Sequence, residues 1–385
     1  MAASLAARAL GRASFQEAFA ARAFIHAMLE FEAALAAAQA AESVIPEAHA
    51  KAIRTACDSV AIDEAALVAE GRRNASLAVP LVKRLREHLA RSSPDAAKSL
   101  HLGATSQDVL DTATALCLKP CLEEADRTLE ATVRAIARHA HEHRATPMLG
   151  RTLLQPALPM SAGLKLARWA AALAADRERL AEGEAAGLAL QLGGPIGTLQ
   201  SMQGKGPAVR HRMALALGLA DAPEWQSHRN AWIDLLDRAA LVALTAGKIA
   251  RDVALLSQAE VGEMREAPAR EGVGGSSAMP HKHNPVACAQ ALSAAVRLPG
   301  LLAALHAAAL GEHERALGGW QAELAIVPEI AACLGSALDF LDTIGASLGV
   351  DAGRMAQNLA RHGERGAIDT QAVDEILAGL APYLG

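Results

Sequence analysis

The sequence predicts an all-α protein, and three features support that fold class. Hydrophobic residues make up 52% of the 385 residues, but aromatic residues make up only 3%. The excess consists of alanine and leucine, which are strong helix formers, whereas strands favour aromatic and β-branched residues. Apolar residues recur at three- and four-residue spacing over long stretches, and short loops rich in glycine and proline separate these stretches. This pattern indicates an elongated helical bundle.

Shorter helices are expected in the first hundred residues. The clearest covers residues 21–42, which form an amphipathic pattern that ends before Pro46. Shorter apolar patterns predict further helices over 49–57, 62–73 and 79–89, the last with a proline near its first turn. We therefore assign residues 1–100 to an N-terminal helical domain.

Five long helices are expected in residues 101–349, which we assign to a central bundle domain. The first begins at Thr105 or Ser106, both good N-caps, and runs to about residue 144, with a kink expected at Pro120. The other four are expected over residues 158–187, over 232–261, after Pro285, and over 327–348. Residues 350–385 are assigned to a short C-terminal helical region.

Composition excludes several classes of function. A net charge of -5 gives no electrostatic case for binding nucleic acid or an anionic membrane surface. No apolar run reaches the length of a membrane span without a charge or a Gly/Pro break. The five cysteines lack the spacing of a zinc site, so they are expected to be small apolar fillers in a reduced compartment. These observations predict a soluble, cytoplasmic protein.

Three motifs suggest a ligand site but fit poorly. The segment GGPIGTLQSMQGKG lacks the spacing of a phosphate loop, since six residues separate Gly197 from Gly204. His139 and His143 share a helix face and are a metal-binding alternative, although histidines at a helix C-terminus also complement the helix dipole. The segment His281–His283 has a competing lysine at its centre. We therefore expect no metal and no cofactor.

One loop carries the residues expected for catalysis. The segment EGVGGSSAMPHKHNPVACAQ, residues 271–290, places a serine pair ahead of Lys282 and Asn284 and before a helix start. Backbone amides, a helix N-terminus and a lysine can together hold a carboxylate or a developing oxyanion. A serine in that environment could remove a proton from carbon next to a carboxylate. A plain flexible loop is the alternative, and composition leaves both open.

The same segment resembles a known family signature. GGSSAMPHKHNP is similar to GSSxMPxKxNP of the fumarase/aspartase superfamily. Its fixed positions are filled by Gly275, Ser276, Ser277, Met279, Pro280, Lys282, Asn284 and Pro285. HLGATSQDVLDTA resembles the first signature of that superfamily and GRTLLQPALP its second, in the family's order. The resemblance implies an all-α fold whose central five-helix bundle forms a twenty-helix homotetramer core with shared active sites.

Within the superfamily, the chain most resembles the 3-carboxy-cis,cis-muconate cycloisomerases. GATSQDVLDTA, GKIARDVALLSQAEVGE, SSAMPHKHNPV and EHERALGGWQAELAIVPEI all look like that family. The resemblance implies interconversion of 3-carboxy-cis,cis-muconate and 4-carboxymuconolactone in the protocatechuate branch of the β-ketoadipate pathway. A small tricarboxylate would be the substrate, without cofactor, nucleic acid or membrane. The alternatives are another superfamily lyase, such as adenylosuccinate lyase, and a non-catalytic relative.

The resemblance also assigns residue roles. Ser276 would be the acid/base on carbon, while Lys282 and Asn284 would stabilise the dianion. His101 resembles a histidine near substrate in related lyases, with a structural hydrogen bond as its alternative. Arg315 is a candidate substrate cation, with a helix salt bridge as its alternative. The implied catalytic residues are Ser276, Lys282 and His101, and the implied substrate-binding residues are Thr105, Ser106, Arg151, Thr152, Gln155, Ser277, Met279, Asn284 and Arg315.

Some positions depart from the family pattern. Many relatives carry a catalytic histidine in the second signature, where this chain has Leu153 and Pro156. This weighs against adenylosuccinate lyase and fumarase. A lactonisation has less need of a second acid/base, because its leaving group is a carboxylate that is already stable as an anion. Position 283 is His where many relatives have Arg, and the C-terminal region is truncated relative to the family's usual one.

Overall fold

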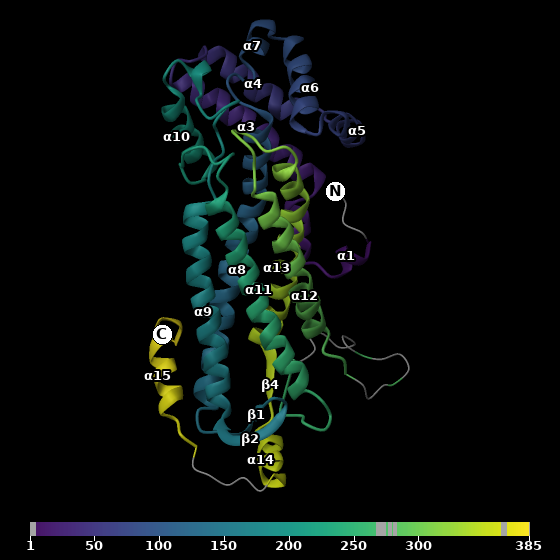
Figure 1. Cartoon of the computed structure of the whole chain (residues 1–385), viewed down its shortest axis with the longest axis vertical. Helices are drawn as coiled ribbons and strands as arrows, with labels where there is room; N and C mark the ends of the chain where they lie inside the picture. The colour runs from purple at the N-terminus through teal and green to yellow at the C-terminus, as the bar shows by residue number, and fades with distance from the viewer. Residues whose placement is uncertain (1–4, 267–274, 276–278, 280–282, 363–367, 385) are drawn as a thin grey trace.

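The protein is an elongated helical bundle (Figure 1). The computed structural model describes residues 5–266, 275, 279, 283–362 and 368–384. Its body consists of five long helices: α8 (Ser106–Glu142), α9 (Ala162–Gly187), α11 (Asn230–Leu256), α12 (Val286–Ala308) and α13 (Gly319–Ser347). The predicted all-α class is therefore confirmed. At about 1.5 Å per residue, the 37 residues of α8 extend about 55 Å, which sets the length of the bundle.

The N-terminal elements are α1 (Leu5–Ala9), α2 (Ala13–Ala18), α3 (Ala21–Ala41), α4 (Glu47–Ser59), α5 (Glu64–Asn74), α6 (Ala78–Ala90) and α7 (Pro94–Ser99). Helices α3 to α7 gather at one end of the bundle, the upper end in Figure 1, while α1 lies beside its middle. The four helices predicted in this region correspond to α3, α4, α5 and α6. Helix α10 (Gly206–Leu217) packs against α3 at the same end. Helix α3 also packs on α8, which fixes the N-terminal helices on the bundle.

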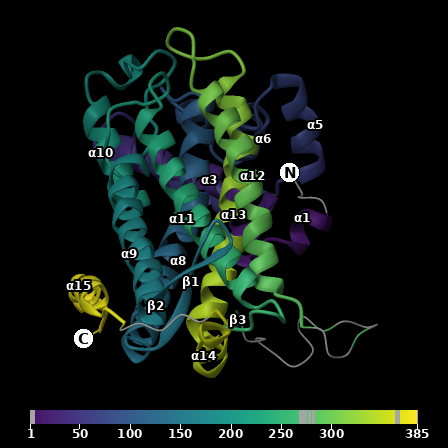
Figure 2. The ribbon, with the colours of Figure 1, turned by 60° about the horizontal axis from the view of Figure 1, so that its bottom comes forward.

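The opposite end carries two small antiparallel sheets. Strands β1 (Pro147–Thr152) and β2 (Gln155–Ser161) form a hairpin, and β3 (Met264–Glu266) pairs with β4 (Leu348–Val350). The chain then forms α14 (Ala352–Arg361), α15 (Gln371–Gly379) and α16 (Ala381–Leu384). Figure 2, with this end forward, shows the hairpin below α8 and α9, with α15 beside α9. The hairpin and α14 thus close the lower end, whereas α15 packs on the side of α9.

Three predicted helix boundaries were wrong. The helix expected to end at residue 261 ends at Leu256. The helix expected from residue 158 begins at Ala162, because the residues before it form strand β2 and Ser161 then caps the helix by accepting from the Leu164 amide. The helix expected from residue 327 begins at Gly319, so Pro328 lies inside it. Helix α8 likewise continues through its internal proline. A proline near a helix start is well tolerated, so it does not by itself locate the start.

Glycines allow close approach between the segments of the bundle. A Cβ at Gly163 would lie 2.5 Å from the carbonyl oxygen of Ala140 and 2.8 Å from Cα of Arg144. Both are backbone atoms, which cannot turn aside as a flexible side chain can. Gly163 therefore lets the start of α9 touch the end of α8.

The variant Gly163→Ala is expected to lower the free energy of unfolding by about 1–3 kcal/mol, the usual cost of overpacking. Gly379→Ala is the matched control, because a Cβ there meets nothing within 4 Å. That change should be neutral or stabilise by up to about 1 kcal/mol. Urea unfolding at one fixed protein concentration measures both, and equal midpoints for the two variants would contradict the expectation.

Candidate active site

The buried carboxylate of Asp108 fixes the first signature to a neighbouring loop at the upper end. Its Oδ1 accepts from the Gly193 amide and the Gln191 side chain, both at 2.9 Å. Its Oδ2 accepts from the amides of Thr105 at 2.9 Å and Gly194 at 3.0 Å. Burial raises the pKa of Asp108 to about 6, although these four donors act in the opposite direction. The carboxylate therefore anchors the start of α8 to the loop over residues 188–205.

The predicted N-cap of the first long helix is confirmed. Thr105 has extended backbone angles and Ser106 is the first helical residue, and both side chains are half-buried. Their backbone therefore opens a helix N-terminus at the surface of the upper end, where a carboxylate is favoured. Their contact with substrate stays a prediction.

His101 forms a short contact with a buried carboxylate on α3. Its Nδ1 lies 2.6 Å from Oε1 of Glu32, whose side chain is wholly buried. His101 itself adopts a left-handed backbone conformation, with φ of 62°. Burial lowers the pKa of His101, but the charge and hydrogen bond of Glu32 outweigh burial, so the pKa lies above its usual value. The pair fixes the ring and leaves Nε2 as the nitrogen that Glu32 does not engage.

Glu32 is a residue that sequence reasoning missed. It lies in a run of buried apolar residues along α3, between Phe31 and Ala33. A carboxylate at such a position is costly unless it has a partner. That mismatch was the available signal, but the partner, 69 residues away, is visible only in the fold.

Arg315 lies in the loop between α12 and α13 and holds the same end together. Its Nη2 donates to the carbonyl oxygens of Gly194 at 3.3 Å and Pro195 at 3.2 Å. Gly194 in turn packs against Gly103, since a Cβ there would lie 2.7 Å from the carbonyl oxygen of Gly103. The alternative of a helix salt bridge is wrong, because Arg315 is outside any helix and donates to carbonyl groups. Its role as a substrate cation stays a prediction.

The second signature forms the hairpin at the other end. Arg151 is bound to the protein itself: Nη1 and Nη2 donate to the two oxygens of buried Glu263 at 2.7 and 2.8 Å. Asn358 on α14 also donates to Glu263, at 2.7 Å. This geometry gives Arg151 a structural role, and its predicted contact with substrate is untested. Thr152 and Gln155 are exposed, on either side of the hairpin turn.

The hairpin turn itself is apolar and exposed. Leu153 and Leu154 both have positive φ, 50° and 64°, and are 96% and 74% exposed. Hairpin turns of this kind are normally built from glycine, asparagine or aspartate. Leu153, one of the two residues that stand where many relatives have a catalytic histidine, therefore lies at the tip of the hairpin, and a leucine side chain cannot transfer a proton.

The third signature is described only in part. Ser276, Ser277 and Lys282 lie outside the described residues. Gly275 and His283 form an antiparallel bridge. Met279 is 41% exposed and Asn284 is half-buried.

The N-terminus of α12 holds a carboxylate, as expected, but the carboxylate is the protein's own. Oε1 of Glu266 accepts from the Ala287 amide at 3.0 Å and Oε2 from the Cys288 amide at 2.8 Å. The expectation that the start of this helix helps to hold an anion from solution therefore needs correction. These two amides are already occupied.

The described candidates fall into two groups at opposite ends of the bundle (Figure 1). His101, Thr105, Ser106 and Arg315 lie at the upper end, near the start of α8. Arg151, Thr152, Gln155, Met279 and Asn284 belong to the segments at the lower end. About 55 Å of helix α8 lies between the residues near its start and the hairpin that carries Arg151, and about 35 Å of helix α12 lies between Asn284 and the loop that carries Arg315. One chain therefore does not bring all the described candidates into one site.

A buried ionic cluster lies beneath the upper end. Arg229 donates to both oxygens of Asp111, at 2.7 and 3.2 Å, and to Glu323 at 2.5 Å. The indole of Trp232 also donates to Glu323, at 3.1 Å. The guanidinium lies 4.6 Å from the ring centre of Trp225. The cluster joins α8, α11 and α13 just below the loops that carry the upper candidates.

Comparison with known proteins shows that this chain is similar to lyases and cycloisomerases. A family model described as a lyase matches residues 11–300. A 3-carboxy-cis,cis-muconate cycloisomerase of Bradyrhizobium diazoefficiens is 46% identical, over 89% of this chain and 76% of that protein. A nitrosuccinate lyase of Streptomyces davaonensis is 39% identical, over 94% and 77%. The crystal structure of the 3-carboxy-cis,cis-muconate lactonizing enzyme of Pseudomonas putida has a TM-score of 0.85 at 37% identity, over 93% and 79%.

Proposed function

This chain belongs to the lyase family of the fumarase/aspartase superfamily, and on that basis we propose that it interconverts 3-carboxy-cis,cis-muconate and 4-carboxymuconolactone. The observation that carries the proposal is similarity to enzymes of that name over about nine-tenths of the chain. Leu153 at the hairpin tip supports it, because a lactonisation has less need of a second acid/base than the lyases that use a histidine of the second signature.

The reaction needs one carbon acid/base and an anion clamp. In the lactone-forming direction, a substrate carboxylate oxygen bonds to one alkene carbon, and the neighbouring carbon, next to another carboxylate, takes a proton. Ser276 delivers that proton, and Lys282 with Asn284 stabilises the dianion that precedes its transfer. In the reverse direction Ser276 removes the proton and the carboxylate oxygen leaves. The reaction belongs to the protocatechuate branch of the β-ketoadipate pathway.

His101 is a further polar group of the proposed site. The Glu32 carboxylate holds the ring at Nδ1 and favours its protonated form, so Nε2 presents a positive donor. A substrate with three carboxylates needs such donors beyond the lysine. His101 therefore binds and orients substrate charge at the end of the molecule where Thr105 and Ser106 open a helix N-terminus.

The variant Glu32→Gln is expected to move the pH profile of kcat/KM. Glu32 raises the pKa of His101, so a neutral glutamine lets that pKa fall, with Asp108 and Arg86 as the other charges facing the ring. The alkaline limb should therefore move to lower pH, and kcat/KM should fall more at pH 8 than at pH 6. The wild-type pair also stabilises the fold below about pH 6.5, and that contribution is lost as pH rises through the higher folded pKa.

Glu30→Gln is the matched control for this pH profile, because Glu30 lies on the same helix and pairs with Arg54 rather than His101. Its pH profile should match the wild type. An unchanged profile in Glu32→Gln would contradict the role given to the pair.

We propose that the protein is a homotetramer with active sites shared between subunits. The separation of the candidate residues supports this, since a second copy can bring its lower end to the upper end of the first. Helix α12 gives independent support: only 22% of its most apolar 18-residue window is buried in the described structure, and Val296 is 73% exposed. An apolar helix face of this kind is typical of an interface.

Light scattering measures the number of subunits, and mixing two inactive variants tests whether neighbouring subunits share an active site. His101→Ala and Ser276→Ala, each nearly inactive alone, should regain part of the activity when subunits are exchanged by mild denaturation and refolding. A fully active monomer would overturn the proposal.

We also propose a cytoplasmic location. Helices α12 and α13 are long and apolar enough to cross a membrane by length and composition alone. However, 61% of the most apolar window of α13 is buried within the bundle. Core burial and subunit contact account for both helices.

The activity itself has a direct test. Pure protein is mixed with 3-carboxy-cis,cis-muconate, and loss of the conjugated-diene absorbance is followed. A parallel assay uses nitrosuccinate, because a nitrosuccinate lyase is among the similar proteins. Turnover of the muconate is expected. No absorbance change at high enzyme concentration would overturn the proposal, and turnover of nitrosuccinate alone would replace it.

A further inference from the structure

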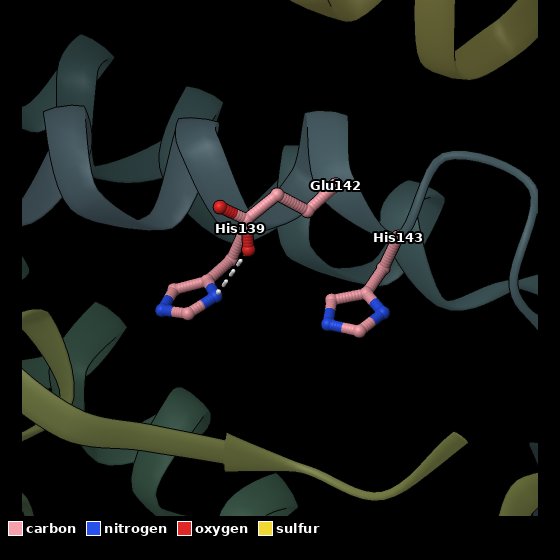
Figure 3. A group of neighbouring side chains, drawn as sticks. All are labelled: His139, Glu142 and His143. Atoms are coloured by element: carbon pink, nitrogen blue, oxygen red, sulfur yellow. Dashed lines mark ion pairs between the residues drawn. The ribbon is translucent and has the colours of Figure 1, made fainter. Parts of the chain in front are cut away.

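Three side chains that could bind a metal ion gather at the last turn of α8 (Figure 3). His139, Glu142 and His143 follow the spacing i, i+3, i+4, which puts them on one helix face. One ligand atom from each lies within 4.8 Å of the others. The two rings are nearly parallel, with planes 17° apart and centroids 6.5 Å apart. Modest side-chain rotations would bring two nitrogens and one carboxylate oxygen to a single point.

The hydrogen bonding of the two histidines fits ligation. Nδ1 of His139 is buried and makes no hydrogen bond, although it lies 3.4 Å from a carboxylate oxygen of Glu142. Nδ1 of His143 lies 3.2 Å from the hydroxyl of Thr146, which fixes that ring and leaves Nε2 available. Metal-binding histidines usually have their second nitrogen held in this way by a neighbouring polar group.

The electrostatics at this position also favour a cation. The C-terminus of a 37-residue helix carries the negative end of the helix dipole, which attracts positive charge. The dipole that explains histidines at this turn therefore also stabilises an ion bound by them.

We propose that His139, Glu142 and His143 bind one divalent transition-metal ion of the zinc type, through two imidazole nitrogens and one carboxylate oxygen. Zinc accepts this donor set and completes a tetrahedral shell with water. The ion would brace the last turn of α8, four residues before β1 begins and where the carbonyl oxygen of His143 accepts from the Gly163 amide. The site is separate from the proposed catalytic residues, so it does not depend on the proposed function.

The test uses the full chain, purified without a histidine tag and treated with EDTA. Calorimetric titration with zinc chloride should show one site per chain. His139→Ala and His143→Ala should each weaken that site at least about tenfold, by analogy with the 10- to 100-fold cost of disturbing metal sites. Alanine is a strong helix former, so both variants should keep their helical circular dichroism. Zinc should also raise the Tm of the wild type.

His141→Ala is the matched control. His141 lies in the same turn but is exposed and interacts with the charge of Asp374 on α15. It should bind zinc as the wild type does. Cu²⁺ added in place of zinc should give an electron paramagnetic resonance spectrum with two nitrogen ligands, and His139→Ala should reduce the number to one. No site in the wild type, or equal binding by wild type and His139→Ala, would overturn the proposal.

Discussion

Ser276→Ala is expected to lower kcat by about 10²- to 10⁴-fold, the range that a positioned acid/base contributes. Ser276 lies outside the described residues, so the expectation rests on the signature and on the proposed reaction. The proton transfer to carbon would lose its carrier, while the carboxylate contacts that set KM would stay. Stopped-flow measurement of diene absorbance separates kcat from KM. Light scattering should show an unchanged assembly.

Ser277→Ala is the control for this experiment, since it removes a neighbouring hydroxyl that is expected to bind substrate. It should raise KM and leave kcat within about tenfold of the wild type, because one neutral hydrogen bond contributes about 1 kcal/mol. A near-normal kcat in Ser276→Ala would place the carbon acid/base elsewhere. His101 would then be the first residue to examine.

Arg229→Met is expected to lower the free energy of unfolding by about 3–5 kcal/mol, the largest stability effect of any single change considered. The arginine is 6% exposed, and it pairs with Asp111 and Glu323, which are 3% and 2% exposed. Removing the cation leaves two carboxylates buried close together. Methionine fills similar volume, so the loss reports charge rather than a cavity.

The pH dependence of this variant distinguishes charge from packing. Burial raises the pKa of Glu323, and Arg229 acts against that rise, so the pKa should climb further in Arg229→Met. A carboxyl group with a raised pKa binds more protons in the folded state than in the unfolded state. The free energy of unfolding of the protein therefore falls as pH rises. The difference in free energy of unfolding between the wild type and Arg229→Met should therefore be smaller at pH 5 than at pH 8, as measured by urea unfolding. A difference equal at both pH values would indicate packing instead.

Lys98→Met is the control for Arg229→Met, because it removes the cation of an ion pair that is exposed to solvent. The side chains of Lys98 and Asp95 are 78% and 80% exposed, so breaking their ion pair should leave the urea midpoint close to that of the wild type at both pH values.

Elements with strong local signals could be predicted from the sequence. The N-cap at Thr105 was recognisable because a threonine precedes an apolar period with Asp108 in the first turn. The start of α12 after Pro285 was recognisable for a similar reason. The hairpin was not predicted, because its turn consists of Leu153 and Leu154 instead of residues that favour positive φ. The pairing of β1 with β2 on either side of the turn sets its conformation, and no local sequence pattern reports that pairing.

The candidate site also contains residues that could be predicted from the sequence and residues that could not. Residues inside signatures were identified, but the partners that fix them were not. Glu32 supports His101 from 69 residues away, and Glu263 binds Arg151 from 112 residues away. Such pairs depend on which helices become neighbours, and periodicity does not encode that. The separation of the two groups was more accessible, because the sequence predicts a helix of nearly this length between the first and second signatures.

The cap formed by Glu266 has a consequence for how the signature segment is held. The two amides that it binds, at Ala287 and Cys288, follow the segment, while Glu266 itself precedes it. Both ends of a span of about twenty residues are thus fastened at one point, and Glu266 is in turn paired to Leu348 of β4. The expected acid/base Ser276 and the expected anion clamp Lys282 therefore belong to a span whose two ends meet at a single carboxylate, so Glu266 sets where that span leaves the scaffold and where it returns.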